Sequence, residues 1–169
     1  MLFRSNYDIS WYDEAEDSFS ISSPAQLAGV AYLVKNGRTF EGKTVTLTGN
    51  IDLDGFKWEP IGKANLQQIF KGVFDGGGYE IHNLRSEVIS TGEAYSGLFG
   101  AIYQARVTRV VLAKDCEIRT SYYGGGVVAY AQESEIVSCE NRASVSFEGP
   151  AGYVGGIAGY VSTSSIDRC

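Results

Sequence analysis

The chain has 169 residues, which is enough for one domain with its own core or for a short array of repeated units. Hydrophobic residues make up 44% of it and aromatic residues 12%, with 21 glycines, a composition typical of a folded chain rich in turns. The formal net charge of -6 argues against nucleic acids and anionic membranes as partners, because both bind clustered Lys and Arg.

No run of residues approaches the roughly 18 to 20 apolar residues of a membrane span, so we expect no membrane insertion. The opening MLFRSNYDISWYDEAEDSF lacks the apolar centre of a signal peptide, which leaves a removed leader or a cytosolic chain. Three cysteines, Cys116, Cys139 and Cys169, do not make the even and dense set of a disulfide framework, so they leave the compartment open.

One early segment, SSPAQLAGVAYLVKNG, predicts a helix over residues 24–36. Ser23 can cap it, Pro24 suits the first helical position and Gln26 completes a capping box. Apolar residues then follow at helical spacing, and Asn36 and Gly37 stop the helix: Leu27, Val30, Ala31 and Val34. We expect this helix to cover the amino-terminal end of whatever fold follows.

From residue 39 onward the chain is punctuated by glycines and polar pairs and predicts short strands and turns. Gly97, Gly126 and Gly156 recur at offsets of 29 and 30 residues. Apolar positions keep the same spacing in three further sets: Leu98, Val127 and Ile157; Val107, Ile136 and Ile166; Val110, Cys139 and Cys169. A shorter, earlier copy runs through Gly72, Val73, Phe74, Ile81 and Leu84. A third strand would carry Cys116 and Ile118, matched by Val145 and Phe147.

A repeat of about 30 residues with three short strands cannot bury its inner face alone, but stacked repeats can. The sequence therefore predicts an all-β fold, a short right-handed parallel β-helix of about 4–5 coils of about 25–30 residues, with one amino-terminal capping helix. We expect residues 1–17 to form an extension or a first strand, and residues 18–169 one β-helix domain with its coils over residues 39–169. Because the chain stops in mid-coil, we expect a fragment of a longer protein or end-to-end self-association at the carboxyl-terminal coil.

The segments SISSPAQLAGVAYLVKNGRTFEGKTVTLTGNIDLDGFKWEPIG, FKGVFDGGGYEIHNL, SGLFGAIYQARVTRVVL and VGGIAGYVSTSSIDRC together resemble the GLUG-motif repeat proteins of bacteria. The chain is similar to the β-helical modules of adhesin-like surface proteins and to noncatalytic regions of secreted immunoglobulin A peptidases. The resemblance covers roughly residues 9–169 and implies a secreted or surface-displayed, extracellular location. Where that family often has asparagine, this chain has Arg109, Ser138 and Arg168, which argues against an internal asparagine ladder.

Residue patterns for catalysis or metal binding are weak. Asp52 to Gly55 begins like a calcium loop, but Lys57 stands where such a loop needs glycine. The glycines after Asp75 predict a turn, and His82 is the only histidine. The acidic residues do not recur at one coil position: Asp52, Asp54, Glu59, Asp75, Glu80, Asp115, Glu133, Glu135 and Glu140. We therefore expect no catalytic residues, no metal and no cofactor, and a chain that is not an enzyme.

A pair of cysteines and a group of aromatic residues remain as candidates for chemistry or binding. Cys139 and Cys169 would be neighbours in adjacent coils, where they form either a disulfide or a buried thiol ladder. Strand alternation predicts that Tyr130 and Tyr160 point outward at equivalent places, with Phe99 and Tyr103 nearby on the preceding coil. Tyr123 and Tyr153 form a second matched pair at the strand entrance.

Outward aromatic residues either bind a host or cell-surface glycan or protein, or serve as outer packing under loops. The sequence favours a noncatalytic bacterial surface or secreted module for adhesion, ligand binding or spacing. The alternative is an accessory region that positions substrate for a secreted peptidase or polysaccharide-active enzyme.

Overall fold

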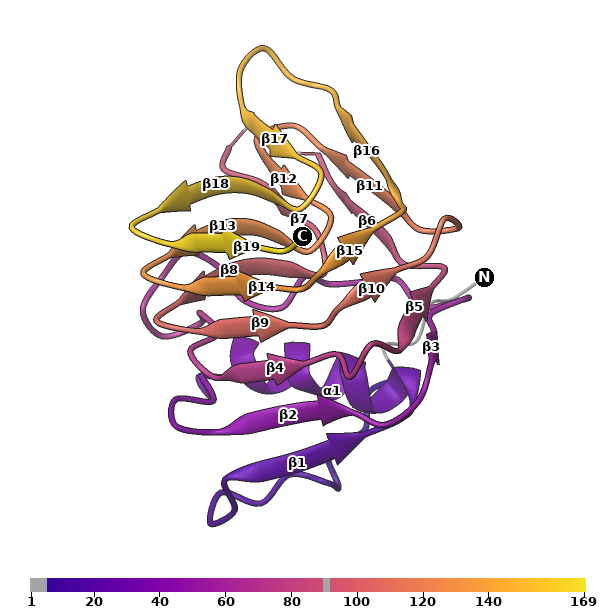
Figure 1. Ribbon diagram of the computed structural model, residues 1–169, viewed down its shortest axis with the longest axis vertical. Coiled ribbons are helices and arrows are strands. Elements are labelled where there is room, and N and C mark those ends of the chain that lie inside the picture. The colour runs from indigo at the N-terminus through magenta and orange to yellow at the C-terminus, as the bar shows by residue number, and fades with distance from the viewer. Residues whose placement is uncertain (1–5, 90–91) are drawn as a thin grey trace.

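The protein is a parallel β-solenoid. The computed structural model describes residues 6–89 and 92–169. In that part of the chain, one helix and 19 strands wind through about five turns, and every strand pair is parallel (Figure 1). The predicted all-β parallel β-helix is confirmed. Residues 6–17 hold no strand, and the rest of the predicted extension, residues 1–5, lies outside the described residues.

The strands form five sheets, one for each side of the coil. The first sheet runs, in spatial order, through β1 (Ser18–Ile21), β2 (Thr44–Leu47), β4 (Val73–Asp75), β9 (Arg106–Thr108), β14 (Glu135–Val137) and β19 (Ser165–Asp167). The second contains β15 (Glu140–Asn141), β10 (Val111–Leu112), β5 (Glu80–His82) and β3 (Ile51–Asp52). The third contains β16 (Ser144–Phe147), β11 (Glu117–Thr120) and β6 (Arg85–Val88). The fourth contains β17 (Tyr153–Gly155), β12 (Tyr123–Gly125) and β7 (Tyr95–Ser96), and the fifth β18 (Ala158–Ser162), β13 (Val128–Gln132) and β8 (Phe99–Tyr103).

The first sheet explains why apolar residues return along the chain. Each of its strands places one apolar residue in register with the next strand, in the order Phe19, Val45, Phe74, Val107, Ile136 and Ile166. All but the last of these are buried. The predicted match of Val107, Ile136 and Ile166 is confirmed, and the earlier copy through Phe74 belongs to the same interior column.

The repeated glycines are required by the closeness of consecutive coils. The Gly126 N–H donates to the Gly156 carbonyl oxygen at 3.0 Å, and the Leu98 N–H donates to the Gly126 carbonyl oxygen at 3.1 Å. A Cβ atom at Gly126 would overlap the Gly156 carbonyl oxygen, and one at Gly97 would overlap that of Gly125. At Gly156 a Cβ atom would meet no atom within 4 Å. The glycine is therefore needed wherever another coil follows.

The residues that follow these glycines also stack. The Val127 N–H donates to the Ile157 carbonyl oxygen at 3.0 Å, and the Phe99 N–H donates to the Val127 carbonyl oxygen at 2.9 Å. Leu98 and Val127 are fully buried, and Ile157 is half-buried against the same core. Leu98, Val127 and Ile157 thus occupy one column, as the repeat predicts.

Two details of the coil differ from the sequence prediction. A full coil carries five short strands instead of three, because turns divide what reads as a longer strand. Ile118 pairs with Val145, so the predicted match of Cys116 with Val145 is wrong by two residues. Four residues separate Leu112 from Glu117, but only two separate their partners Asn141 and Ser144, and this shorter turn shifts the register.

The helix α1 (Pro24–Lys35) begins as predicted. The Ser23 hydroxyl accepts from the Gln26 N–H at 3.2 Å, and Gln26 Oε1 accepts from the Ser23 N–H at 3.2 Å, which closes the capping box. The predicted apolar face, Leu27, Val30, Ala31 and Val34, is buried in the common core. Figure 1 shows the helix behind β2 and β4 at the amino-terminal end of the solenoid.

Aromatic residues that precede β1 close the same end. The Trp11 ring lies 5.3 Å from that of Phe19 and 6.3 Å from that of Phe40, and Tyr12 contacts both rings as well. Both Trp11 and Tyr12 pack against the core. The helix and this aromatic cluster together cover the first coil, which would otherwise present an open strand edge.

The last coil has no such cover among the described residues. Its apolar side chains are exposed at Phe147 (39%), Val154 (39%), Val161 (38%) and Ile166 (45%). Each of β17, β18 and β19 has a strand neighbour on one side only. In the part of the chain that the structure describes, no helix has the length and apolar composition of a membrane crossing.

Replacing a residue of the Val107, Ile136 and Ile166 column by alanine should lower the free energy of unfolding more where the side chain is more deeply buried. Ile136→Ala leaves a cavity between two coils and should cost about 2 to 5 kcal/mol, whereas Ile166→Ala removes a side chain that is 45% exposed and should cost much less. Chemical denaturation of the two variants measures the difference. Equal losses would contradict the stacked interior column.

Candidate functional site

Tyrosines stack on one side of the solenoid. Tyr123 pairs in register with Tyr95 of the preceding coil and with Tyr153 of the following one. The ring centroids are 5.1 and 5.5 Å apart, and the planes are within 9° and 11° of parallel. Because parallel strands hold equivalent residues at a fixed spacing, the register alone places these three rings in a row.

A second tyrosine row runs beside the first. Tyr130 and Tyr160 are in register, and their rings stack with a centroid distance of 5.1 Å. Tyr123 meets Tyr130 edge to face at 5.7 Å, and Tyr153 meets Tyr160 in the same way at 5.2 Å. Tyr122 joins the group through an edge-to-face contact of 4.6 Å with Tyr123. We call these six residues the tyrosine cluster: Tyr95, Tyr122, Tyr123, Tyr130, Tyr153 and Tyr160.

Two of the aromatic residues predicted to face outward lie elsewhere. Phe99 is fully buried, and its ring lies 5.2 Å from both Phe70 and Phe74, so the prediction that it faces outward is wrong. Regular alternation fails in β8, where both Leu98 and Phe99 belong to the core. Tyr103 is half-buried, but it pairs with Gln132 and lies under the Lys71 amine at 5.7 Å, apart from the cluster.

The structure adds Tyr95 and Tyr122 to the predicted set. The repeat pattern could have identified Tyr95, because equivalent strands begin with YSG at Tyr95, YGG at Tyr123 and YVG at Tyr153. The spacing between Tyr95 and Tyr123 is 28 residues, which differs from the 29-residue offset of the neighbouring glycines. Tyr122 has no such repeat to identify it.

Burial keeps Tyr95 and Tyr123 neutral at physiological pH. Burial raises the pKa of Tyr123 to about 12. Burial, together with a 2.8 Å hydrogen bond donated by the Tyr95 hydroxyl to Glu93 Oε2, raises the pKa of Tyr95 further. The Tyr130 hydroxyl donates to Gln132 Oε1 at 3.3 Å. The phenols of Tyr95 and Tyr123 are therefore hydrogen-bonding groups on an apolar body, and not bases or nucleophiles.

Stacking decides which parts of the rings a ligand can reach. Tyr123 has a tyrosine on each face, whereas Tyr153, at the end of its row, is 50% exposed. The cluster thus presents ring edges and hydroxyls along the solenoid, and its two rows end at Tyr153 and Tyr160 in the last coil. Such a surface suits contact with another macromolecule better than the enclosure of a small molecule.

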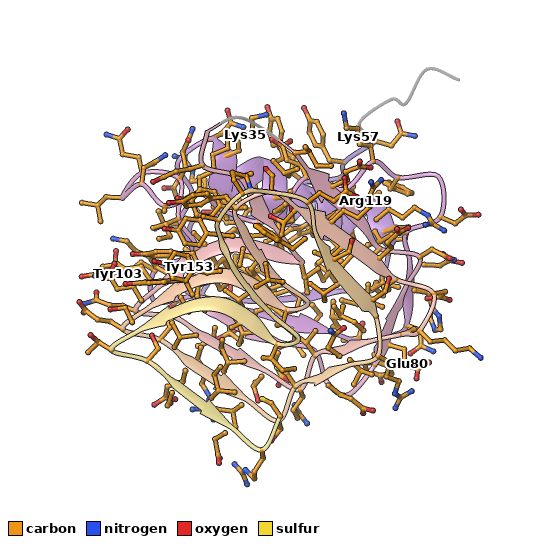
Figure 2. All side chains as sticks on the ribbon, turned by 90° about the horizontal axis from the view of Figure 1, so that it is seen from above. Lys35, Lys57, Glu80, Tyr103, Arg119 and Tyr153 are labelled. Carbon is orange, nitrogen blue, oxygen red and sulfur yellow. The ribbon has the colours of Figure 1, made fainter. Side chains whose placement is uncertain are left out.

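A groove of about 760 Å³ lies apart from this cluster, between α1 and residues 56–60. Tyr7 and Tyr32 stack at 3.9 Å on one wall, and Lys35 and Glu59 form a 2.8 Å ion pair across it. Figure 2 shows Lys35 and Lys57 at one side of the molecule, and Tyr103 and Tyr153 at another. The groove has no counterpart in the coil repeat, so the repeat pattern could not predict it.

The two motifs that resemble ligand loops form turns. Asp52 Oδ1 accepts from the Asp54 N–H at 3.0 Å and from Asn83 Nδ2 at 2.9 Å. Asp75 Oδ1 accepts from the Gly77 N–H at 2.9 Å and from Arg109. Gly77 and Gly78 have positive φ angles of 63° and 77°, and the turn joins β4 to β5 as predicted. Within residues 6–89 and 92–169, no three His, Cys, Asp or Glu side chains gather in a way that could hold a metal ion.

A group of ion pairs lies on the side opposite the tyrosines. Arg119 pairs with Glu87 of the preceding coil at 3.1 Å and with Glu148 of the following one. Arg142 contacts Glu80 and Glu140, each at 2.7 Å. Figure 2 shows Glu80 and Arg119 away from Tyr103 and Tyr153. Some of the acids that look scattered in the sequence therefore pair with arginines of other coils, as Asp75 does with Arg109 and Glu135 with Arg106, and each exposed pair contributes about 0 to 1 kcal/mol.

His82 belongs to this charged side. Its Nδ1 is 3.0 Å from Asp115 Oδ2, and its Nε2 is 3.2 Å from Glu80 Oε2. The hydrogen bond with Asp115 is the main reason that the pKa of His82 is raised above 6.5, and the charges of Asp115, Glu80 and Asp52 act in the same direction. The same hydrogen bond lowers the pKa of Asp115. His82 thus joins three coils by charge.

Stability should depend on pH through His82. Because its folded pKa is raised, protonated His82 stabilises the fold fully below pH 6.5, and this contribution is lost as the pH rises through the folded pKa. Replacing it in His82→Gln should lower the unfolding midpoint more at about pH 5.5 than at about pH 8.5. Thermal unfolding of both proteins at the two pH values measures this. A difference that does not change with pH would refute the charge role of His82.

Comparison with known proteins returns no relative. No family model, no curated protein and no solved structure matches the chain. The tyrosine cluster is therefore a candidate site on the geometry of this chain alone.

Proposed function

We propose that the chain is a noncatalytic module of a bacterial surface or secreted protein, and that it binds a partner through the tyrosine cluster. The observation that carries this proposal is the register of Tyr95, Tyr123 and Tyr153, which gathers phenol groups from three coils on one side of the solenoid. A protein or glycan surface presented by a host or a cell is the partner that this geometry fits.

The physics of tyrosine supports recognition at such a surface. A tyrosine offers a large apolar body with a hydroxyl that donates and accepts, and ordering it costs little entropy because only two side-chain torsions are fixed. In the cluster those torsions are already restricted by neighbouring rings, so little further ordering is lost on binding. Aromatic residues are also the ones that most often dominate the energy of protein interfaces.

The location is supported by the resemblance to the GLUG-motif repeat proteins, which are secreted or surface-displayed. A solenoid also suits display, because each coil contacts only its neighbours and the array is stiff along its axis. The adhesion, ligand-binding and spacing roles all use this stiffness, and the binding role adds the tyrosine cluster.

Binding should fail when the exposed end of the cluster is removed. Tyr153→Ala combined with Tyr160→Ala should weaken binding to a glycan or host-protein array by at least about tenfold, because both rings have accessible faces. The matched control is Tyr79→Ala, which removes a tyrosine that is 40% exposed and lies in the turn before β5. It should leave every array signal unchanged.

The same variants separate binding from packing. Loss of ring stacking should lower the stability of the double variant by about 0.5 to 1.5 kcal/mol per stacked pair. If the double variant shows this loss and still binds like the wild type, the tyrosine cluster serves only as outer packing. That result would end the proposed role of these tyrosines.

We also propose that two copies associate through their carboxyl-terminal coils. The amino-terminal end is covered by α1 and Trp11, so a second copy would meet the exposed apolar residues of the last coil with the same surface of its own. The open edges of β17, β18 and β19 support this arrangement, since unpaired strands pair readily.

Solution scattering should reveal this association as a dimer at high protein concentration. Val161→Lys should shift it to the monomer, because Val161 is 38% exposed at the open end and a buried, unpaired charge opposes the contact. A wild type that stays monomeric at every concentration would exclude the association.

A further inference from the structure

Cys139 and Cys169 occupy equivalent places in the last two coils. Val137 pairs in register with Asp167, two residues before each cysteine. The intervening residues, Ser138 and Arg168, both have left-handed backbones, with φ angles of 54° and 51°. The backbone therefore leaves β14 and β19 through the same kind of turn. Neighbouring strands lie about 4.8 Å apart, which is within the Cα separation of about 4.4 to 6.8 Å that a disulfide spans.

The sulfur atoms point the same way from these two backbones. Cys139 Sγ lies 3.6 Å from the Val137 carbonyl oxygen and 3.7 Å from that of Val107 in the preceding coil. Cys169 Sγ makes the matching contacts, since it lies 3.3 Å from the Asp167 carbonyl oxygen and 3.7 Å from that of Ile136. The Cys139 N–H also donates to Cys169 Sγ at 3.3 Å, which places the second sulfur directly beside the first cysteine.

The third cysteine, Cys116, lies in a different environment from the other two. Cys116 is buried, its Sγ lies 3.2 Å from the Ile81 carbonyl oxygen, and it accepts from the Leu84 N–H at 3.4 Å. No second cysteine contacts it among the described residues. Cys116 is therefore an internal control for the reactivity of the other two.

We propose that Cys139 and Cys169 form an intramolecular disulfide when the protein meets a small-molecule disulfide oxidant such as oxidised glutathione, and that this bond fastens the last coil to the preceding one. Both cysteines are free thiols in the structure. The inference uses only their placement in the solenoid and does not depend on the proposed binding function. An extracellular location, which the resemblance implies, would supply the oxidising conditions in which such a bond persists.

The reaction begins at the exposed thiol. Cys169 is open to solvent, so its thiolate attacks one sulfur of the oxidant, and the first glutathione thiolate leaves. The Cys139 thiolate then attacks Cys169 Sγ in the mixed disulfide, and the second glutathione thiolate leaves. The two protons lost by the protein go to the two glutathione thiolates. In sum, two protein thiols are oxidised by two electrons, and one glutathione disulfide is reduced to two thiols.

Burial makes the second step the slow one. Cys139 is 1% exposed, and burial raises its pKa to about 11, so little of it is thiolate near neutral pH. The mixed disulfide at Cys169 should therefore appear first and decay into the internal bond. This decay should accelerate as the pH rises toward the pKa of Cys139.

The bond would act on the least supported part of the solenoid. It would close a loop that contains β15 to β19, which form the last coil. A cross-link between two ends of a segment removes open conformations of that segment, so local opening of the last coil becomes rarer.

Mass spectrometry of the oxidised protein tests the bond directly. The wild type is incubated with oxidised glutathione, quenched, unfolded, alkylated and mapped. We expect loss of two hydrogens, a peptide that joins Cys139 to Cys169, and alkylation of Cys116 alone. Cys116→Ser should form the same bond, whereas Cys169→Ser should leave Cys139 reduced. A permanent glutathione adduct at Cys169, a disulfide between two chains, or full alkylation of both cysteines would overturn the proposal.

Hydrogen exchange gives the second measurement. Amides of β17, β18 and β19 should exchange at least about tenfold more slowly in the oxidised wild type than in the reduced one. Treating Cys169→Ser with the oxidant should produce no change, and Cys116→Ser should behave as the wild type. Equal exchange in the oxidised and reduced wild type would show that the bond does not fasten the coil.

Discussion

The structure depends on one interaction: the backbone hydrogen bonds between in-register parallel strands of consecutive coils. These bonds fix equivalent residues about 4.8 Å apart, and each side of the coil then repeats its own chemistry along the axis. On one side the repeat gives the buried column from Phe19 to Ile166. On another it gives the stacked tyrosines, and on a third the arginine and glutamate pairs. Core, candidate site and surface charge all follow from the same register.

The sequence could predict the fold because the constraint that creates the coil is visible in residue spacing. Glycine recurs where a Cβ atom would strike the next coil, and the column of Val107, Ile136 and Ile166 recurs because one interior is shared. The helix was predictable for a different reason, since its capping box lies within four consecutive residues around Ser23 and Gln26. In both cases a local pattern carries a physical requirement that tertiary context does not override.

The candidate site was less predictable, because turns of unequal length break simple spacing. The turn before β11 is two residues longer than its counterpart before β16, which shifts the pairing of these two strands by two residues, while the later pairs return to the repeat spacing. Strand alternation also failed at Phe99, because a short strand next to a glycine turn places two consecutive residues in the core. Several turns depend on residues whose left-handed backbones no composition rule identifies, including Gln104, Arg109 and Glu133. Their conformation is imposed by the hydrogen bonds of the neighbouring coil.

The same register that builds the tyrosine cluster also limits it. When identical rings stack along the axis, each covers a face of the next, so adding coils adds edges and hydroxyls but no further open faces. A ligand that needs ring faces can use only the end of a row, whereas one that contacts edges and hydroxyls can use its whole length. Tyr153 and Tyr160 stand at that end, in the coil that also carries Cys169 and the exposed apolar residues. Order in the last coil is therefore what holds the accessible tyrosine faces in place.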